Sequence, residues 1–169
     1  MPNVPKAVLI VAPHTSGWDV VYAVAAMLAL GIRARWMAKH TLFRPPLGAV
    51  LRYLGGLAIE RSSHHGVVQQ AIAAFNREPK LVLGIAPEGT RSRVHEWKTG
   101  FYHIARGARV PIVCVFLDYE QRRLGFGPSL EPSGDIHADM DVLRRFYSRK
   151  VGHHPELFDP EWAFGDEGY

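Results

Sequence analysis

The sequence has a single cysteine, Cys114, in its 169 residues. One cysteine cannot form an internal disulfide, and this one lies within the apolar run VPIVCVF, so we expect a small buried side chain. The N-terminus lacks an apolar stretch of signal-peptide length that is followed by a small-residue cleavage site. We therefore expect a protein of a reducing compartment that is not exported.

Long hydrophobic runs are also missing. The longest, residues 20–30, is about half of the roughly 20 residues that a membrane-spanning helix needs. Internal repeats, linkers and low-complexity segments are absent, and the composition, 47% apolar and 21% charged, is that of an ordinary globular protein. The length suits one domain, residues 1–169, without room for two cores.

Two chemical signatures are absent as well. There is no G-x-S-x-G turn of a serine hydrolase. The histidine pairs, His64–His65 and His153–His154, have no cysteine or acidic cluster at ligand spacing, and adjacent side chains point apart, so we expect no metal site. The formal charge of +4 favours an anionic partner. No nucleic-acid-binding motif accompanies that charge, so we expect no nucleic acid as the partner.

Short apolar runs alternate with segments of helical period, which predicts an α/β fold with a mostly parallel central sheet flanked by helices. We expect a core over residues 6–120, followed by a hairpin, a helix and a tail over 121–169, the tail lying on the surface. The expected strands are 6–12, 32–38, 57–60, 80–86, 110–118 and 122–126, and the expected helices begin near residues 19, 46, 63, 99 and 136.

A histidine and an aspartate, His14 and Asp19, follow the first expected strand. Residues five apart are about 140° apart around a helix and do not share a face. If the helix begins near Ser16, however, His14 lies on the loop and Asp19 in the first turn, where the two can meet. A carboxylate that holds one imidazole nitrogen leaves the other free to accept a proton. Alternatively, Asp19 only caps the helix, with Ser16 as the hydroxyl of a capping box.

A second polar cluster, APEGTRSR, follows the strand expected at 80–86. Its proline and glycine predict a turn, and Arg91 with the neighbouring hydroxyls suits a phosphate, with Glu88 orienting Arg91. Arg61 and Lys98 follow neighbouring segments, so the three cations can form one basic pocket. The alternative is an ordinary turn with a solvated ion pair.

These pieces occur together and in order, and the chain resembles the glycerolipid acyltransferase family typified by 1-acylglycerol-3-phosphate acyltransferases, in particular its short bacterial members. The resemblance rests on H-x-x-x-x-D at His14 and Asp19, G-x-x-x-I-x-R ending at Arg61, E-G-T-R-S from Glu88 and V-P-I-V from Val110. It covers roughly residues 6–120. Pro13 and Cys114 depart from residues that are common in the family, so the subfamily stays open.

The resemblance implies a glycerol-3-phosphate acyltransferase-like fold, with His14 as the general base and Asp19 as the residue that orients it. It implies a donor, acyl-CoA or acyl carrier protein, an acceptor such as a lysophospholipid, and no metal or bound cofactor. The implied acceptor-phosphate site is Arg61, Glu88, Gly89, Thr90, Arg91 and Lys98, and the implied acyl region is Val110, Pro111, Ile112 and Val113.

Two alternatives remain at this point. The chain can be a non-catalytic lipid-phosphate binding module, or an acyltransferase for an acceptor that is not a glycerolipid. The basic, partly apolar stretch at residues 39–56 fits either a membrane interface or a core-facing helix with solvated cations. We expect a cytoplasmic protein with possible peripheral contact to the inner face of the cell membrane.

Overall fold

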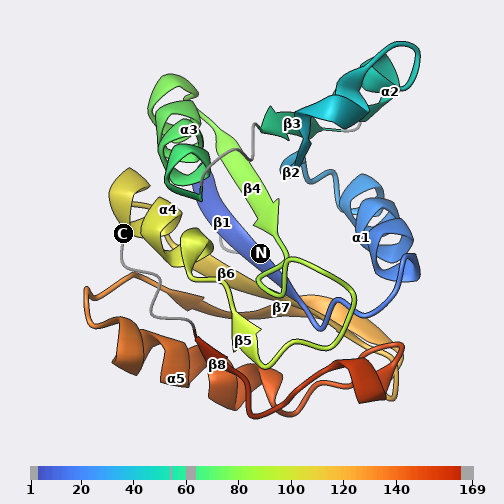
Figure 1. The fold of residues 1–169 in the computed structure, drawn as a ribbon, viewed down its shortest axis with the longest axis vertical. Helices are drawn as coiled ribbons and strands as arrows, with labels where there is room; N and C mark the ends of the chain where they lie inside the picture. The colour runs from blue at the N-terminus through green and yellow to red at the C-terminus, as the bar shows by residue number, and fades with distance from the viewer. Residues whose placement is uncertain (1–3, 54, 60–63, 165–169) are drawn as a thin grey trace.

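The structure is a computed structural model that describes residues 4–53, 55–59 and 64–164 (Figure 1). Within this part, a six-stranded sheet has the strand order β3-β2-β4-β1-β6-β7. Neighbouring strands are parallel except for β7, which runs antiparallel to β6 and forms the expected hairpin. The strands are β1 (Lys6–Ala12), β2 (Ala34–Lys39), β3 (Gly56–Ile59), β4 (Leu81–Ile85), β6 (Ile112–Asp118) and β7 (Arg123–Leu130).

The central strand β1 divides its apolar side chains between the two faces of the sheet. Val8, Ile10 and Ala12 belong to the large core, whereas Ala7 and Leu9 belong to a smaller cluster on the other face. Such a strand is apolar on both faces because helices cover both, which explains its unbroken apolar sequence. The α/β prediction with a mostly parallel sheet is therefore confirmed.

The two faces are covered unequally, as Figure 1 shows with α3 and α4 on one side of the sheet and α1 on the other. The large core contains side chains of three amphipathic helices, such as Phe75, Phe101 and Leu143. On the opposite face, Asp19 is the buried residue that helix α1 contributes. The helices are α1 (Trp18–Ala29), α2 (Leu47–Tyr53), α3 (His64–Arg77), α4 (Gly100–Ala108) and α5 (Ile136–Tyr147), with short 3-10 turns at His40–Phe43 and Pro155–Leu157.

The segment before and within α2 is only partly core-facing. Phe43 is buried, but Leu47, Val50 and Tyr53 on α2 are all more than half exposed. The core-facing interpretation of this helix is therefore wrong for these three residues, whereas Leu51 is partly buried. None of the described helices is both long and apolar enough to cross a lipid bilayer.

The expected surface position of the C-terminal tail is wrong in part. Trp162 is fully buried, and its ring stacks on that of Trp97 with the ring centroids 3.8 Å apart. The stack lies at a small parallel pair of strands, β5 (Glu96–Trp97), which contains Trp97, and β8 (Ala163–Phe164), which directly follows Trp162. The tail is anchored because burial of a large aromatic side chain outweighs the proline-rich, polar character of the residues around it.

Candidate functional site

The candidate site lies where three neighbouring parallel strands end. Strands β4, β1 and β6 are adjacent in the sheet, and each is followed by a loop at its carboxyl end. Ligands in open α/β sheets bind at this edge, beside helix N-termini. Loops that are far apart in the sequence therefore meet here: residues 13–17 after β1, 86–92 after β4, and Tyr119 after β6.

His14 and Asp19 meet as the first prediction requires. The Nδ1 atom of His14 is 3.2 Å from Oδ2 of Asp19. The side chain of His14 is 18% exposed and that of Asp19 1% exposed, so the aspartate lies behind the histidine as seen from solvent. With a proton on Nδ1, the pair leaves Nε2 of His14 to accept a proton from a bound group.

Asp19 also anchors the loop that leads into α1, although the N-cap of this helix is Gly17 and has no side-chain cap. Its Oδ2 accepts hydrogen bonds from the backbone N–H groups of Thr15 and Ser16, at 2.9 and 2.8 Å. The hydroxyl of Ser16 accepts from the backbone N–H of Trp18 at 3.2 Å. In a standard capping box the hydroxyl accepts from the third residue after it, whereas Trp18 is the second. The expected capping box is therefore not formed, and the same carboxylate holds both the loop and the imidazole of His14.

The protonation of Asp19 reflects opposing influences. Burial raises the pKa of its carboxyl, but hydrogen bonds from His14, Tyr119 and the backbone of Ser16 favour the charged form, and the pKa is lowered overall. Asp19 is therefore an anion at neutral pH. A buried anion of this kind stabilises a positive charge on the neighbouring imidazole.

Tyr119 completes the contacts of Asp19, and no sequence motif pointed to it. Its hydroxyl donates to Oδ1 of Asp19 at 2.7 Å, across a separation of 100 residues. Burial and the negative charge of Asp19 raise the pKa of Tyr119, so the phenol keeps its proton. The topology alone could have indicated Tyr119, because this residue directly follows β6, the strand next to β1.

Glu88 has a different contact from the one expected. Its Oε1 accepts the backbone N–H of His14 at 2.9 Å, whereas we expected the carboxylate to orient Arg91. The side chain is buried, and Oε2 has no hydrogen-bond partner among the described residues. Burial raises the pKa of Glu88 to about 7, although the bond from the His14 backbone opposes the shift. The reason is the strand order: adjacent β1 and β4 bring residue 88 against the His14 loop.

The turn after β4 carries the remaining polar residues. Gly89 has φ of +68°, a conformation that L side chains rarely adopt, so this position favours glycine. A Cβ built on Gly89 would lie 3.2 Å from Cε of Lys98, so Lys98 packs against the turn. A Cβ on Gly17 would lie 3.2 Å from a guanidinium nitrogen of Arg91, which places Arg91 beside the start of α1.

Two cavities meet at His14. A polar cavity of about 370 Å³ is lined by His14, Gly89, Thr90 and Arg91, together with residues from the end of β4. A second, largely apolar cavity of about 260 Å³ lies between α1 and the sheet, and it also reaches His14 and Asp19. Its apolar lining comes from five strands, β1, β2, β4, β6 and β7, and from α1, and includes Leu9, Val11, Ala23, Met27, Val115 and Phe126.

Some predicted site residues do not line these cavities. Val110 to Val113 lie at the start of β6, where Val110, Ile112 and Val113 are buried in the core. They are absent from the lining of the apolar cavity, to which β6 contributes Val115 instead. Their assignment to the acyl region stays a prediction, and Arg61 falls outside the described residues.

Other reactive side chains lie elsewhere. Cys114 is fully buried, and burial raises the pKa of its thiol to about 12. His95 and Asp159 form a second histidine–aspartate pair, 2.6 Å apart, but the side chain of His95 is 75% exposed. Within the described residues, no group of three or more His, Cys, Asp or Glu side chains is placed to hold a metal ion.

Comparison with known proteins identifies the family. The family model described as Acyltransferase matches residues 2–118, which include His14, Asp19, Glu88 and Arg91. The chain belongs to this acyltransferase family, in agreement with the resemblance to glycerolipid acyltransferases. No curated protein and no solved structure matches the chain.

Proposed function

We propose that this acyltransferase moves a fatty acyl group from a thioester to a hydroxyl group of a phosphate-bearing lipid acceptor. The observation that carries the proposal is the position of His14 at the junction of a polar and an apolar cavity. In this proposal the acyl chain occupies the apolar cavity and the phosphate of the acceptor occupies the polar one. The two reacting groups would then meet beside the imidazole.

In the proposed reaction, Nε2 of His14 removes the proton of the acceptor hydroxyl as its oxygen attacks the thioester carbonyl. The C–O bond of the new ester forms, the C–S bond breaks, and the proton leaves on the released thiol. Asp19 orients the ring and stabilises its positive charge during transfer. The donor would be acyl-CoA or acyl carrier protein, and the step requires no metal or bound cofactor because the thioester is already activated.

The polar cavity supports a phosphate-bearing acceptor such as 1-acylglycerol-3-phosphate, as in phospholipid biosynthesis. Arg91 and Thr90 line it, and Lys98 packs on the same turn. A planar guanidinium forms two parallel, charge-assisted hydrogen bonds with a phosphate. The resemblance to the family implies Arg61 as a further contact to this phosphate.

A thiol-release assay tests the proposal directly. Acyl-CoA and acyl carrier protein donors of several chain lengths are combined with lysophosphatidate, other lysophospholipids and alcohols without a phosphate. We expect fast release only with a phosphate-bearing acceptor. Fast release with unphosphorylated alcohols would favour another acceptor class, and no release with any pair would favour a non-catalytic lipid-phosphate binding module.

The variant Arg91→Gln is expected to raise the KM for the acceptor about 10- to 100-fold, because a charge-assisted contact to the phosphate is lost. The kcat should change little. The matched control is Arg93→Gln, two residues along in the same exposed turn but outside the polar cavity. Equal acceptor KM values for the two variants would contradict a phosphate contact at Arg91.

We also infer a membrane contact on the side of α1 and α2. Five apolar side chains of these helices are each more than half exposed: Trp18, Val21 and Leu28 of α1, and Val50 and Tyr53 of α2. Residues 20–59 contain no aspartate or glutamate, while arginines 33, 44 and 52 are exposed. An apolar surface with only positive charges suits an anionic lipid surface. We propose that this contact is made with the inner face of the cell membrane.

The double variant Leu28→Asp and Tyr53→Asp is expected to lower binding to anionic vesicles at least about tenfold, because it places charge where apolar side chains would enter the lipid. Flotation with phosphatidylglycerol-containing and purely neutral vesicles measures the binding. The control is Val142→Asp, an exposed apolar position on α5. A dimer in solution that only the double variant dissociates would show that a second copy, not lipid, covers this face.

A further inference from the structure

Tyr119, which contacts Asp19, lies just outside the segment that the family model matches. That segment ends at residue 118, and Tyr119 is the next residue. Its hydroxyl nevertheless donates to Oδ1 of Asp19 at 2.7 Å. A group beyond the family's matched residues therefore touches the residue that orients His14.

The two carboxylate oxygens of Asp19 have separate partners. Oδ2 interacts with Nδ1 of His14 and accepts two backbone N–H groups. Among the described residues, Tyr119 is the hydrogen-bond donor that the structure gives to Oδ1. Removing this donor would leave a buried anionic oxygen unpaired and would free the carboxylate to rotate away from His14.

Tyr119 is itself held by the strap, which we define as residues 151–154. The backbone N–H of Tyr119 donates to the carbonyl of Val151 at 2.9 Å. The Tyr119 ring packs edge-on against His153, with centroids 4.9 Å apart, and against Tyr22 of α1, with centroids 6.1 Å apart. The hydroxyl is thus directed at Asp19 by contacts from two separate parts of the chain.

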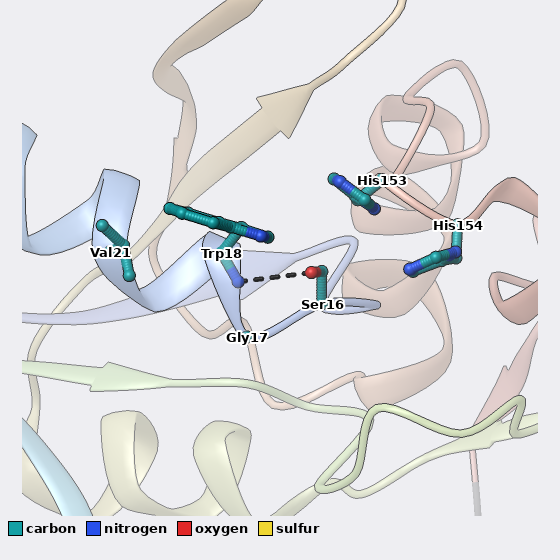
Figure 2. Close-up of a pocket in the computed structure, with 6 residues that line it drawn as sticks. All are labelled: Ser16, Gly17, Trp18, Val21, His153 and His154. Atoms are coloured by element: carbon teal, nitrogen blue, oxygen red, sulfur yellow. Dashed lines mark hydrogen bonds between the residues drawn. The ribbon is translucent and has the colours of Figure 1, made fainter.

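The strap also contacts the His14 loop. The backbone N–H of His154 donates to the hydroxyl of Thr15 at 3.1 Å. Gly152 is buried, and a Cβ at this position would lie 2.7 Å from the same hydroxyl, so only glycine lets the strap approach so closely. Figure 2 shows His153 and His154 across a pocket from Ser16 and Trp18, at the start of α1. The strap therefore joins Tyr119 to the loop that carries His14.

We propose that Tyr119, held by the strap, is a positioning residue that fixes the Asp19 carboxylate in the orientation that His14 requires. The inference rests on the proposed function of His14 and Asp19. Tyr119 does not reach the reacting atoms in this arrangement. It acts through Asp19, as a hydrogen-bonded partner that keeps the pair in one geometry.

The variant Tyr119→Phe tests the proposal because it keeps the ring contacts and removes only the hydroxyl. We expect kcat for thiol release to fall about tenfold, the effect of losing one hydrogen bond to a charged group, with both KM values within about twofold of wild type. The matched control is Tyr22→Phe, which removes a neighbouring hydroxyl for which the structure gives no contact to Asp19. An unchanged kcat in Tyr119→Phe, or equal losses in both variants, would overturn the proposal.

A double-mutant cycle separates positioning from a general effect on the fold. In an Asp19→Asn background, Tyr119→Phe is expected to lower kcat further by less than about twofold, because the partner of the hydroxyl is already changed. A full tenfold loss in both backgrounds would mean that Tyr119 acts independently of Asp19, and the proposal would fail.

A readout without turnover distinguishes this proposal from the proposed function. The ring ¹⁵N resonances of His14, assigned with His14→Ala, are expected to shift in Tyr119→Phe and to stay unchanged in Tyr22→Phe. If wild-type protein releases no thiol from any donor but these resonances shift, the proposed function fails and the positioning role stands. If the protein turns over and the resonances do not shift, the positioning role fails alone.

Discussion

Replacing His14 with alanine is expected to lower kcat for thiol release about 10²- to 10⁴-fold, the usual contribution of a general base. The physical reason is the position of the imidazole, which lies at the junction of the two cavities with Nδ1 turned to a buried aspartate. Without it, no other described side chain with a free basic nitrogen reaches both cavities. Steady-state kinetics with saturating donor and acceptor measures the loss.

The matched control for His14→Ala is His95→Ala. His95 forms a pair with Asp159 that is shorter than the His14–Asp19 pair, 2.6 against 3.2 Å, but its side chain is 75% exposed and it lines neither cavity. We expect nearly unchanged turnover in the control. A comparable loss in both variants, or near-normal turnover in His14→Ala, would remove His14 from the role of base.

The second large effect concerns stability and Glu88. Its pKa is raised from 4.5 to about 7 by burial. Between these values the unfolded chain carries the ionised carboxylate while the folded protein keeps the proton, so the folded state binds more protons and its stability falls as pH rises. The loss begins above pH 4.5 and is complete above pH 7. A shift of this size corresponds to about 3 kcal/mol of unfolding free energy.

The variant Glu88→Gln removes this loss. The amide keeps an oxygen that can accept the backbone N–H of His14, but it cannot ionise. The unfolding free energy of the variant minus that of wild type is therefore expected to rise by about 3 kcal/mol between pH 5 and pH 8. Urea denaturation at several pH values measures it.

An exposed position provides the control for the Glu88 prediction. The variant Glu131→Gln changes the same chemical group on the surface, and its unfolding free energy is expected to run parallel to wild type across the range. If the unfolding free energy of Glu88→Gln minus that of wild type does not change between pH 5 and pH 8, Glu88 is ionised in the folded protein throughout this range. Its bond to His14 would then hold a charged carboxylate near neutral pH.

Local patterns in the sequence were sufficient to predict the strands of the main sheet and part of the site. The unbroken apolar run of β1 predicts a strand covered on both faces, and the structure places its side chains in two clusters. His14 and Asp19 could be predicted to meet because a helix begins between them, which is a short-range property. The same holds for the turn at Gly89, whose positive φ follows from local chain geometry.

Contacts between distant segments required the tertiary structure. Three contacts join residues 65 or more positions apart: the bond between Glu88 and the backbone of His14, the bond from Tyr119 to Asp19, and the stacking of Trp162 on Trp97. Hydrophobic periodicity determines which residues form a strand, but it carries no information about which strands become neighbours. The strand order β4-β1-β6 brings together the loops that carry Glu88, His14 and Tyr119. The loose packing of α1 on the sheet leaves the apolar cavity that ends at His14.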